Sequence, residues 1–239
     1  MPLDDFFGSL DAFPFSETLR DLDALEEYFS MRDEALSKIS ASDPSSLAAN
    51  HVVIKGNVHI GEDCDIDPFV LIEEPAWIGN RVKIRSGALI RAGTILGDDV
   101  VIGHGAEIKN AHVAAGAKLQ SNVFVGDSII GTEVRIGSGT ILANRRFDQA
   151  VVFLDLGGNK VPVGRDKFGA VIGDRTRIGA NATTAPGTMI GPDCIVYSNA
   201  SIAGTIPGRS IVKLRSQIEI VPRQGDNFTL SSRDSQGKL

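Results

Sequence analysis

Histidine is the side chain that most readily exchanges a proton near neutral pH, and this sequence of 239 residues contains four. One of them, His104, lies in the run VIGHGAEIKN and could serve as a general base. The alternative is an exposed histidine with nothing to orient it, and the sequence leaves both interpretations open. In the segment KLQSNVFVGD (118–127), no side chain between Lys118 and Asp127 titrates near neutral pH, so chemistry there needs a base from elsewhere.

The segment RRFDQAVVFLDLGGNKVPVGRDKFG (145–169) carries a second group of candidate functional residues. Its basic side chains are Arg145, Arg146, Lys160, Arg165 and Lys167. They could contact the phosphates of a nucleotide, a sugar or coenzyme A, or they could pair with the acidic residues of a neighbour. The whole chain has a net charge of −6 and a sequence pI of about 5.2, which disfavours general binding to nucleic acid or to an anionic membrane. Any phosphate site is therefore expected to be local.

A six-residue repeat must position these residues. Ten aliphatic side chains follow one another at intervals of six residues from Ile54 to Ile108, and the pattern recurs, with breaks, as far as Ile202. A period of six fits neither an amphipathic helix nor an alternating strand, but it suits a short strand followed by a turn. Three such units make one coil, and we predict an all-β parallel β-helix of about seven coils over residues 51–223, with 145–169 as a loop insertion. Two small inward positions of the repeat hold cysteines, which we interpret as core residues: Cys64 and Cys194.

One unit of the repeat is a residue short, because the aliphatic positions Ile108 and Val113 are only five residues apart. His104 and Ser121 each follow an aliphatic position by two residues, and the coil between them contains this short unit. They are therefore expected to lie one above the other on adjacent coils, about 4.8 Å apart at the backbone. His112 could line the same cleft, although the short unit is expected to turn it outward.

The segments outside the repeat differ in composition. Residues 1–50 are expected to form an N-terminal arm, an amphipathic helix over 16–39 capped by Ser16, and a polar linker over 40–50. Residues 224–239 are expected to be a flexible tail. Four phenylalanines suggest that the arm docks on its own or a neighbouring subunit: Phe6, Phe7, Phe13 and Phe15. The sequence shows neither a secretory signal nor a run that could span a bilayer, so we expect a cytoplasmic protein.

Residues 90–178 carry a more specific pattern, in the runs IRAGTILGDDVVIGHGAEIKNAHV, VGDSIIGTEVRIGSGTILANRRFD and GRDKFGAVIGDRTRIGAN. These runs resemble the C-terminal domain of the bifunctional UDP-N-acetylglucosamine pyrophosphorylase/glucosamine-1-phosphate N-acetyltransferases and of their archaeal sugar-1-phosphate nucleotidyltransferase relatives. The resemblance implies a left-handed β-helix of the hexapeptide-repeat acyltransferase family. It also implies a homotrimer with active sites between subunits and acetyl-CoA as acyl donor, with no metal. It does not extend to the nucleotidyltransferase domain, so uridyl transfer is not expected.

The resemblance also suggests roles for individual residues. The family holds its sugar phosphate with an arginine and a lysine one full coil apart, and Arg91 and Lys109 occupy those positions. A planar guanidinium and a mobile ammonium then share a face as a phosphate clamp. Asn144 matches the family's asparagine in the loop after GxGT. Lys213 and Arg215 match the region where the family's basic groups approach coenzyme A.

Other positions depart from the family pattern. Ser121 stands where the family has its catalytic histidine, and Phe124 stands where it has a substrate-contacting tyrosine. Arg135 replaces an asparagine and Ala150 replaces a lysine. A serine hydroxyl needs another group to accept its proton near neutral pH, so His104 on the adjacent coil is the candidate base.

Three functions are consistent with these observations. The first is an acyl-CoA-dependent transferase that acts on an amino sugar phosphate or a nucleotide-linked amino sugar. The second is a catalytically inactive module that binds a sugar phosphate or nucleotide sugar, which the changes at Ser121 and Phe124 favour. The third is a trimeric scaffold whose N-terminal helix and arm recruit a separately encoded nucleotidyltransferase. The resemblance favours the first function, while the replaced residues favour the second.

Overall fold

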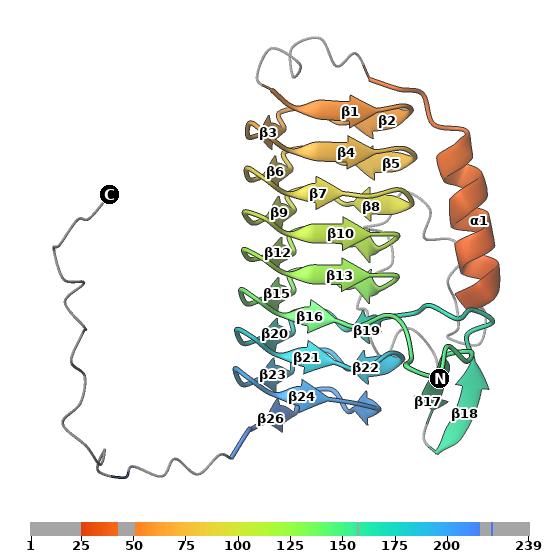
Figure 1. The fold of residues 1–239 in the computed structure, drawn as a ribbon, viewed down its shortest axis with the longest axis vertical. Helices are drawn as coiled ribbons and strands as arrows, with labels where there is room; N and C mark the ends of the chain where they lie inside the picture. The colour runs from red at the N-terminus through yellow and green to blue at the C-terminus, as the bar shows by residue number, and fades with distance from the viewer. Residues whose placement is uncertain (1–24, 43–50, 157, 216–220, 222–239) are drawn as a thin grey trace, which may run out of the picture.

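The chain winds into a left-handed parallel β-helix whose three faces are parallel β-sheets (Figure 1). The computed structural model describes residues 25–42, 51–156, 158–215 and 221. Each of the three sheets contains eight strands, and successive strands along the chain pass from one sheet to the next. The predicted all-β solenoid is thus confirmed.

The strands fall into three sets, which we call sheets I, II and III. Sheet I comprises β1 (Val53–Lys55), β4 (Leu71–Glu73), β7 (Leu89–Ile90), β10 (Glu107–Lys109), β13 (Phe124–Gly126), β16 (Ile141–Leu142), β21 (Thr183–Thr184) and β24 (Ser201–Ile202). Sheet II comprises β2 (Val58–Ile60), β5 (Ala76–Ile78), β8 (Thr94–Leu96), β11 (His112–Val113), β14 (Ile129–Ile130), β19 (Ala170–Ile172), β22 (Thr188–Ile190) and β25 (Thr205–Ile206). Sheet III comprises β3 (Asp65–Ile66), β6 (Lys83–Ile84), β9 (Val101–Ile102), β12 (Lys118–Leu119), β15 (Arg135–Ile136), β20 (Arg177–Ile178), β23 (Ile195–Val196) and β26 (Ile211–Val212).

The solenoid has eight coils, one more than the repeat predicts. The last coil departs from the six-residue spacing, because Ile206 follows the inward Ile202 after only four residues. Ile206 nevertheless pairs with Ile190, and Val212 pairs with Val196. The final coil is therefore two residues shorter than three full units, which hides it from a search at a period of six.

The interior of the solenoid is a stack of aliphatic layers, as the repeat predicts. Ile72, Ile78 and Ile84 are completely buried, one on each face of a single coil. Cys194 is buried and Cys64 packs against the same core, which confirms their inward positions. Because every coil buries its apolar side only against its neighbours, the stability of the stack is roughly the sum of its coil-to-coil contacts.

One helix and one hairpin cover the outer surface of sheet II. Helix α1 (Leu25–Ser37) lies beside the solenoid with its axis along the stack (Figure 1). The loop insertion folds into an antiparallel hairpin of β17 (Phe153–Leu156) and β18 (Asn159–Pro162). A second apolar cluster joins helix, hairpin and sheet: Leu25, Tyr28, Phe29, Ile129, Val152, Leu154, Val163, Phe168, Val171 and Met189. Burial of each large member contributes about 1.5–3 kcal/mol, so this cluster fixes α1 on sheet II.

The helix confirms part of the predicted N-terminal segment. Its described portion falls within the predicted range 16–39, whereas the Ser16 cap and the phenylalanine-rich arm lie outside the described residues, as do the tail 224–239 and most of the linker. Within the described part of the chain, no helix is long and apolar enough to cross a membrane.

Candidate functional site

The predicted phosphate clamp lies on the outer face of sheet I. Ile90 pairs with Ile108, and the amide of Arg91 donates a hydrogen bond of 2.8 Å to the carbonyl of Ile108. This register places Arg91 directly beside Lys109 on adjacent coils, as their spacing of one full coil predicts.

Two carboxylates flank the guanidinium of Arg91. Its Nη1 lies 2.9 Å from Oε1 of Glu107, and its Nε lies 3.7 Å from Oε2 of Glu73. Glu73 also lies 3.8 Å from the ammonium of Lys55, so charges alternate from Lys55 through Glu73 to Arg91. The acids orient Arg91, but a phosphate has to compete with them for its hydrogen bonds. Sequence spacing did not predict this competition.

His104 and Ser121 occupy the corner between sheets III and I. Ile102 pairs with Leu119, and the amide of Asn122 donates a hydrogen bond of 2.8 Å to the carbonyl of His104. The two residues therefore stack across the shortened coil, as predicted. On the other side, Nδ1 of His104 lies 3.3 Å from the hydroxyl of Ser86. The exposed imidazole thus has one neighbour that helps to orient it.

Phe124 and Asn144 share a patch on the same sheet. A Cβ atom added to Gly126 would lie 2.6 Å from Nδ2 of Asn144 and 2.9 Å from Cζ of Phe124. A Cβ atom at this position would therefore displace at least one of the two side chains from its place over β13. Lys109 and Asn144 sit at the edge of sheet I that leads to sheet II, whereas His104 and Ser121 sit at the opposite edge.

The distance across sheet I limits how these groups can cooperate. Five residues of chain separate His104 from Lys109, which corresponds to at most about 16 Å at the backbone. The structure therefore brings together two subsets, Arg91 with Lys109 and His104 with Ser121, on the two edges of one face.

Asn144 belongs to a chain of polar side chains that sequence reasoning missed. The carboxylate of Asp127, which is 6 % exposed, accepts a hydrogen bond of 2.5 Å from Asn144 and one of 2.6 Å from Asn110. The side-chain oxygen of Asn110 in turn accepts a hydrogen bond from Arg32 of α1. Asp127 therefore fixes both amides and links the candidate site to the helix.

His112 points out of the solenoid, as predicted, but α1 covers it. The residue is 1 % exposed, its ring stacks on Tyr28 at a centroid distance of 6.0 Å, and it shares a hydrogen bond with the hydroxyl of Tyr28. Burial, assisted by the nearby charge of Arg32, holds the pKa of His112 well below its usual value. It packs against the helix and does not line the face that carries Lys109.

Three arginines of the basic loop 145–169 pair with acidic side chains of the same chain. Arg165 lies 3.6 Å from Asp33 of α1 and over the ring of Phe29 at 4.6 Å. Arg146 pairs with Asp148 at 2.5 Å, and Ala150 is exposed nearby. These contacts favour the packing interpretation for Arg165 and Arg146, with the acidic partners supplied by the same subunit.

The two residues proposed to approach coenzyme A lie at the far end of the stack. The ammonium of Lys213 lies 6.0 Å from the ring centre of Tyr197, and Arg215 is exposed. Lys213 follows β26 in the eighth coil, whereas Arg91 follows β7 in the third. Five coils correspond to about 24 Å, so within one chain these residues are separate from the clamp.

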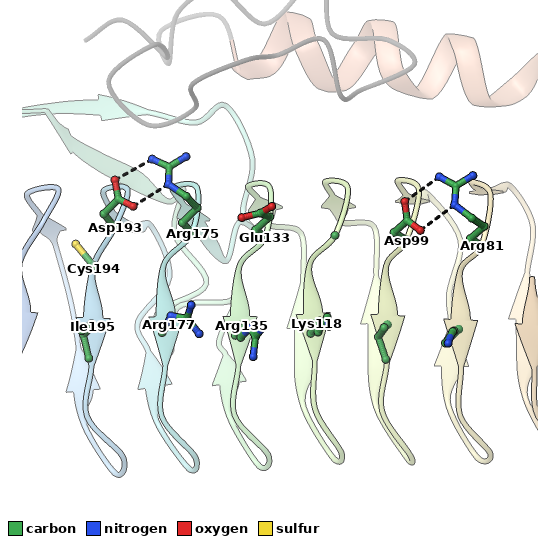
Figure 2. A pocket seen from close by; sticks show the side chains of 13 residues that line it. Arg81, Asp99, Lys118, Glu133, Arg135, Arg175, Arg177, Asp193, Cys194 and Ile195 are labelled. Atoms are coloured by element: carbon green, nitrogen blue, oxygen red, sulfur yellow. Dashed lines mark hydrogen bonds and ion pairs between the residues drawn. The ribbon is translucent and has the colours of Figure 1, made fainter.

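Sheet III carries a hollow that the sequence did not predict (Figure 2). Its volume is about 700 Å³, and its lining includes Lys118, Arg135 and Arg177 from successive coils. In the sequence, Arg135 stands out only as a departure from the family's asparagine. Within the described residues, no group of three or more histidine, cysteine or acidic side chains is placed to hold a metal ion.

Two family models match the chain. Residues 72–168 match the GMPPB C-terminal domain, and residues 169–204 match the bacterial transferase hexapeptide model of six repeats. Together they cover most of the solenoid.

Individual relatives agree with these models. The chain is 36 % identical over 168 residues to a bifunctional sugar-1-phosphate nucleotidylyltransferase/acetyltransferase from Sulfurisphaera tokodaii, which covers 70 % of this chain and 42 % of that protein. It is 37 % identical over 174 residues to the bifunctional protein GlmU of Methanococcus vannielii, covering 73 % and 42 %. It is 33 % identical over 173 residues to YaiX, an uncharacterized acetyltransferase from Escherichia coli O6:K15:H31, covering 71 % and 75 %. The chain thus spans less than half the length of these two bifunctional relatives.

Proposed function

Because the chain belongs to the hexapeptide-repeat transferase family, we propose that it is an acyl-CoA-dependent N-acyltransferase. Its acceptor is an amino sugar phosphate or a nucleotide-linked amino sugar, and its donor is acetyl-CoA. The observation that carries the proposal is the register that stacks Arg91 beside Lys109 and His104 beside Ser121 on the two edges of sheet I.

The proposed residues divide the work between binding and proton transfer. Arg91 and Lys109 hold the phosphate of the acceptor, and Asn144 contacts the acceptor or the thioester. The amine nitrogen attacks the thioester carbonyl, a C–N bond forms, and the C–S bond breaks to release coenzyme A as its thiolate, which takes up the proton removed from the amine. His104 accepts the proton of the amine at Nε2, while the Ser86 hydroxyl lies 3.3 Å from Nδ1. No enzyme nucleophile is needed, so positioning and deprotonation supply the catalysis.

A homotrimer would explain why the phosphate clamp and the candidate base lie apart within one subunit. The clamp and His104 lie at opposite edges of sheet I, separated by at most about 16 Å of backbone. Packing of sheet I against a second subunit can bring one subunit's His104 toward the other subunit's clamp. The mass of the particle in solution, measured by light scattering, tests this, and a monomer would count against the shared site.

The transferase is tested by release of coenzyme A thiol from acetyl-CoA in the presence of glucosamine-1-phosphate. His104→Ala should lower turnover at least about 100-fold, because a general base contributes that much or more. His51→Ala is the matched control, since His51 is exposed and stacks on Phe69 at 5.9 Å in the first coils. Equal turnover in wild type and His104→Ala would remove His104 from the mechanism.

A second function, a binding module without transfer activity, is favoured by the flanking of Arg91 by two carboxylates and by the serine at position 121. Binding of glucosamine-1-phosphate without binding of acetyl-CoA in isothermal titration would support this function and reject the transferase. A scaffold that binds neither ligand is the remaining alternative, and it would depend on α1 and the segment before it.

A further inference from the structure

Three cations form a ladder on the outer face of sheet III. Lys118 pairs with Arg135, and Arg135 pairs with Arg177, so the three side chains leave adjacent strands β12, β15 and β20. Strands lie about 4.8 Å apart, which places the three cations along about 10 Å of surface. Figure 2 shows them side by side on successive strands. We call these three residues the cation ladder.

The cation ladder differs from the other stacked arginines. Arg81 is held by Asp99 at 2.8 Å, and Arg175 is held by Asp193 at 2.8 Å. By contrast, no ion pair or side-chain hydrogen bond joins a member of the cation ladder to another side chain of the described segments. Like charges at directly paired positions of a sheet destabilise it. The ladder is therefore an arrangement that an anion would stabilise.

The cation ladder lies in a hollow on the outer face of sheet III, and this hollow can hold a ligand. The hollow over these strands has a volume of about 700 Å³. Its wall contains the Arg81–Asp99 and Arg175–Asp193 ion pairs, which lie along the turns in Figure 2. Six basic and three acidic side chains line it, giving a local charge of +3 in a chain of net charge −6. A local positive field of this kind concentrates anionic ligands.

We propose that the cation ladder binds the diphosphate group of a nucleoside diphosphate, and that the acceptor of the proposed reaction is accordingly a nucleotide-linked amino sugar. A single phosphate can engage one or two of the three cations, whereas two linked phosphates engage the whole ladder. The two guanidinium groups supply paired N–H donors, and Lys118 supplies a mobile point charge. The second clause rests on the proposed function and moves the phosphates of the acceptor from Arg91 and Lys109 on sheet I to the ladder on sheet III. Binding of a diphosphate to the ladder does not depend on it.

The position of the cation ladder relative to His104 and Ser121 supports binding of a nucleotide-linked sugar there. Lys118 precedes Ser121 by three residues, so the ladder leads into the corner where Ser121 stacks on His104. A diphosphate on the ladder would direct the attached sugar toward this corner. Val101 and Ile195 occupy the paired positions beyond the two ends of the ladder, where they offer apolar surface to the nucleoside or the sugar.

The test is isothermal titration of the full chain with UDP, UMP and inorganic phosphate at low salt. UDP should bind at least about tenfold more tightly than UMP, because the second phosphate reaches further cations. The double variant Arg135→Gln/Arg177→Gln should weaken UDP binding at least about tenfold. Its thermal midpoint should not fall, since both side chains are exposed and unpaired by acids among the described residues. Equal affinities for UDP and UMP, or an unchanged affinity in the double variant, would overturn the proposal.

Controls separate the ladder from other phosphate sites. Arg85→Gln removes one charge from an arginine paired with Asp65 and Asp67 outside the hollow, and it should leave UDP binding unchanged. Competition with coenzyme A itself tests the other source of such a group, because its nucleotide also carries two linked phosphates. Displacement of UDP by this competitor at equal concentration would assign the ladder to the donor and overturn the acceptor clause.

The two proposals fail in different ways. If UDP binds through the ladder but acetyl-CoA transfers nothing to UDP-glucosamine or to glucosamine-1-phosphate, the transferase is wrong and the ladder stands. If transfer to UDP-glucosamine occurs and the double variant keeps the wild-type KM for it, the transferase stands and the ladder is wrong.

Discussion

Replacement of Arg32 by methionine should release α1 from the solenoid while the coils stay intact. The Arg32 side chain is completely buried and donates to the Asn110 carbonyl at 3.2 Å and to the Asn110 side-chain oxygen. It also lies over the ring of Phe29 at 4.8 Å, and Asp33, its acidic partner, is half exposed. Methionine keeps most of the volume but removes the charge and all of the donors.

The magnitude follows from these contacts. Each hydrogen bond from a charged donor contributes about 1.5–3 kcal/mol, so the two bonds to Asn110 contribute roughly 3–6 kcal/mol. The cost of keeping a guanidinium out of water, several kcal/mol, offsets part of this. We expect a net loss of about 2 kcal/mol in the docking of α1, which corresponds to about 30-fold faster exchange of its amide hydrogens.

Hydrogen–deuterium exchange read by mass spectrometry measures this directly. Peptides from α1 should exchange faster in Arg32→Met, while peptides from sheets I and III should not change. Lys38→Met is the control, because the Lys38 side chain is 70 % exposed and pairs with Glu34 of the same helix. Exchange of α1 at the wild-type rate in Arg32→Met would refute the claim that the Arg32–Asn110 contact holds the helix in place.

Three further predictions concern Asn144, Arg91 and His112. Asp127→Gly should raise the KM for the acceptor, because it frees the Asn144 amide while glycine adopts the positive φ of 48° at this position without strain; an unchanged KM would exclude a positioning role. Glu107→Gln should tighten binding of glucosamine-1-phosphate severalfold in calorimetric titration, since it removes a competitor for Arg91, and weaker binding would contradict this. Because the pKa of His112 is depressed in the folded protein, stability against urea should fall as pH drops below about 6.5, where only the unfolded histidine takes up a proton. His112→Phe should show a shallower fall, and an identical slope would reject this explanation.

The repeat predicted the solenoid because its inward positions recur every six residues and each must be aliphatic or small. The same counting, with the short unit between Ile108 and Val113 included, placed His104 beside Ser121 and Arg91 beside Lys109. Stacking in a β-helix is set by local spacing, so these neighbours could be read from the sequence. The domain boundaries at 51 and 223 stay predictions.

The contacts of α1 could not be predicted in this way. Arg32 and Asn110 are 78 residues apart, and Tyr28 and His112 are 84 apart, so no local periodicity relates them. They meet only because the apolar side of α1 packs on sheet II and not on another face.

The cation ladder could not be predicted from the sequence for a different reason. Lys118 and Arg135 are separated by a single coil, but the chain between Arg135 and Arg177 is more than twice as long because it includes the loop insertion. Their alignment appears only when the length of chain that leaves the solenoid is known. The hairpin of β17 and β18 supplies that information, and the sequence had a signal for it in the apolar run before DLGGNK.

The most direct test of the account is mass spectrometry of the acceptor after incubation of the purified chain with acetyl-CoA and an equimolar mixture of glucosamine-1-phosphate and UDP-glucosamine. An N-acetylated product is expected in proportion to released coenzyme A, with the UDP-linked sugar consumed first and with turnover at least about 100-fold lower in His104→Ala. Recovery of both acceptors unmodified, from protein that binds either of them, would show that the chain recognises its ligand without transferring an acyl group.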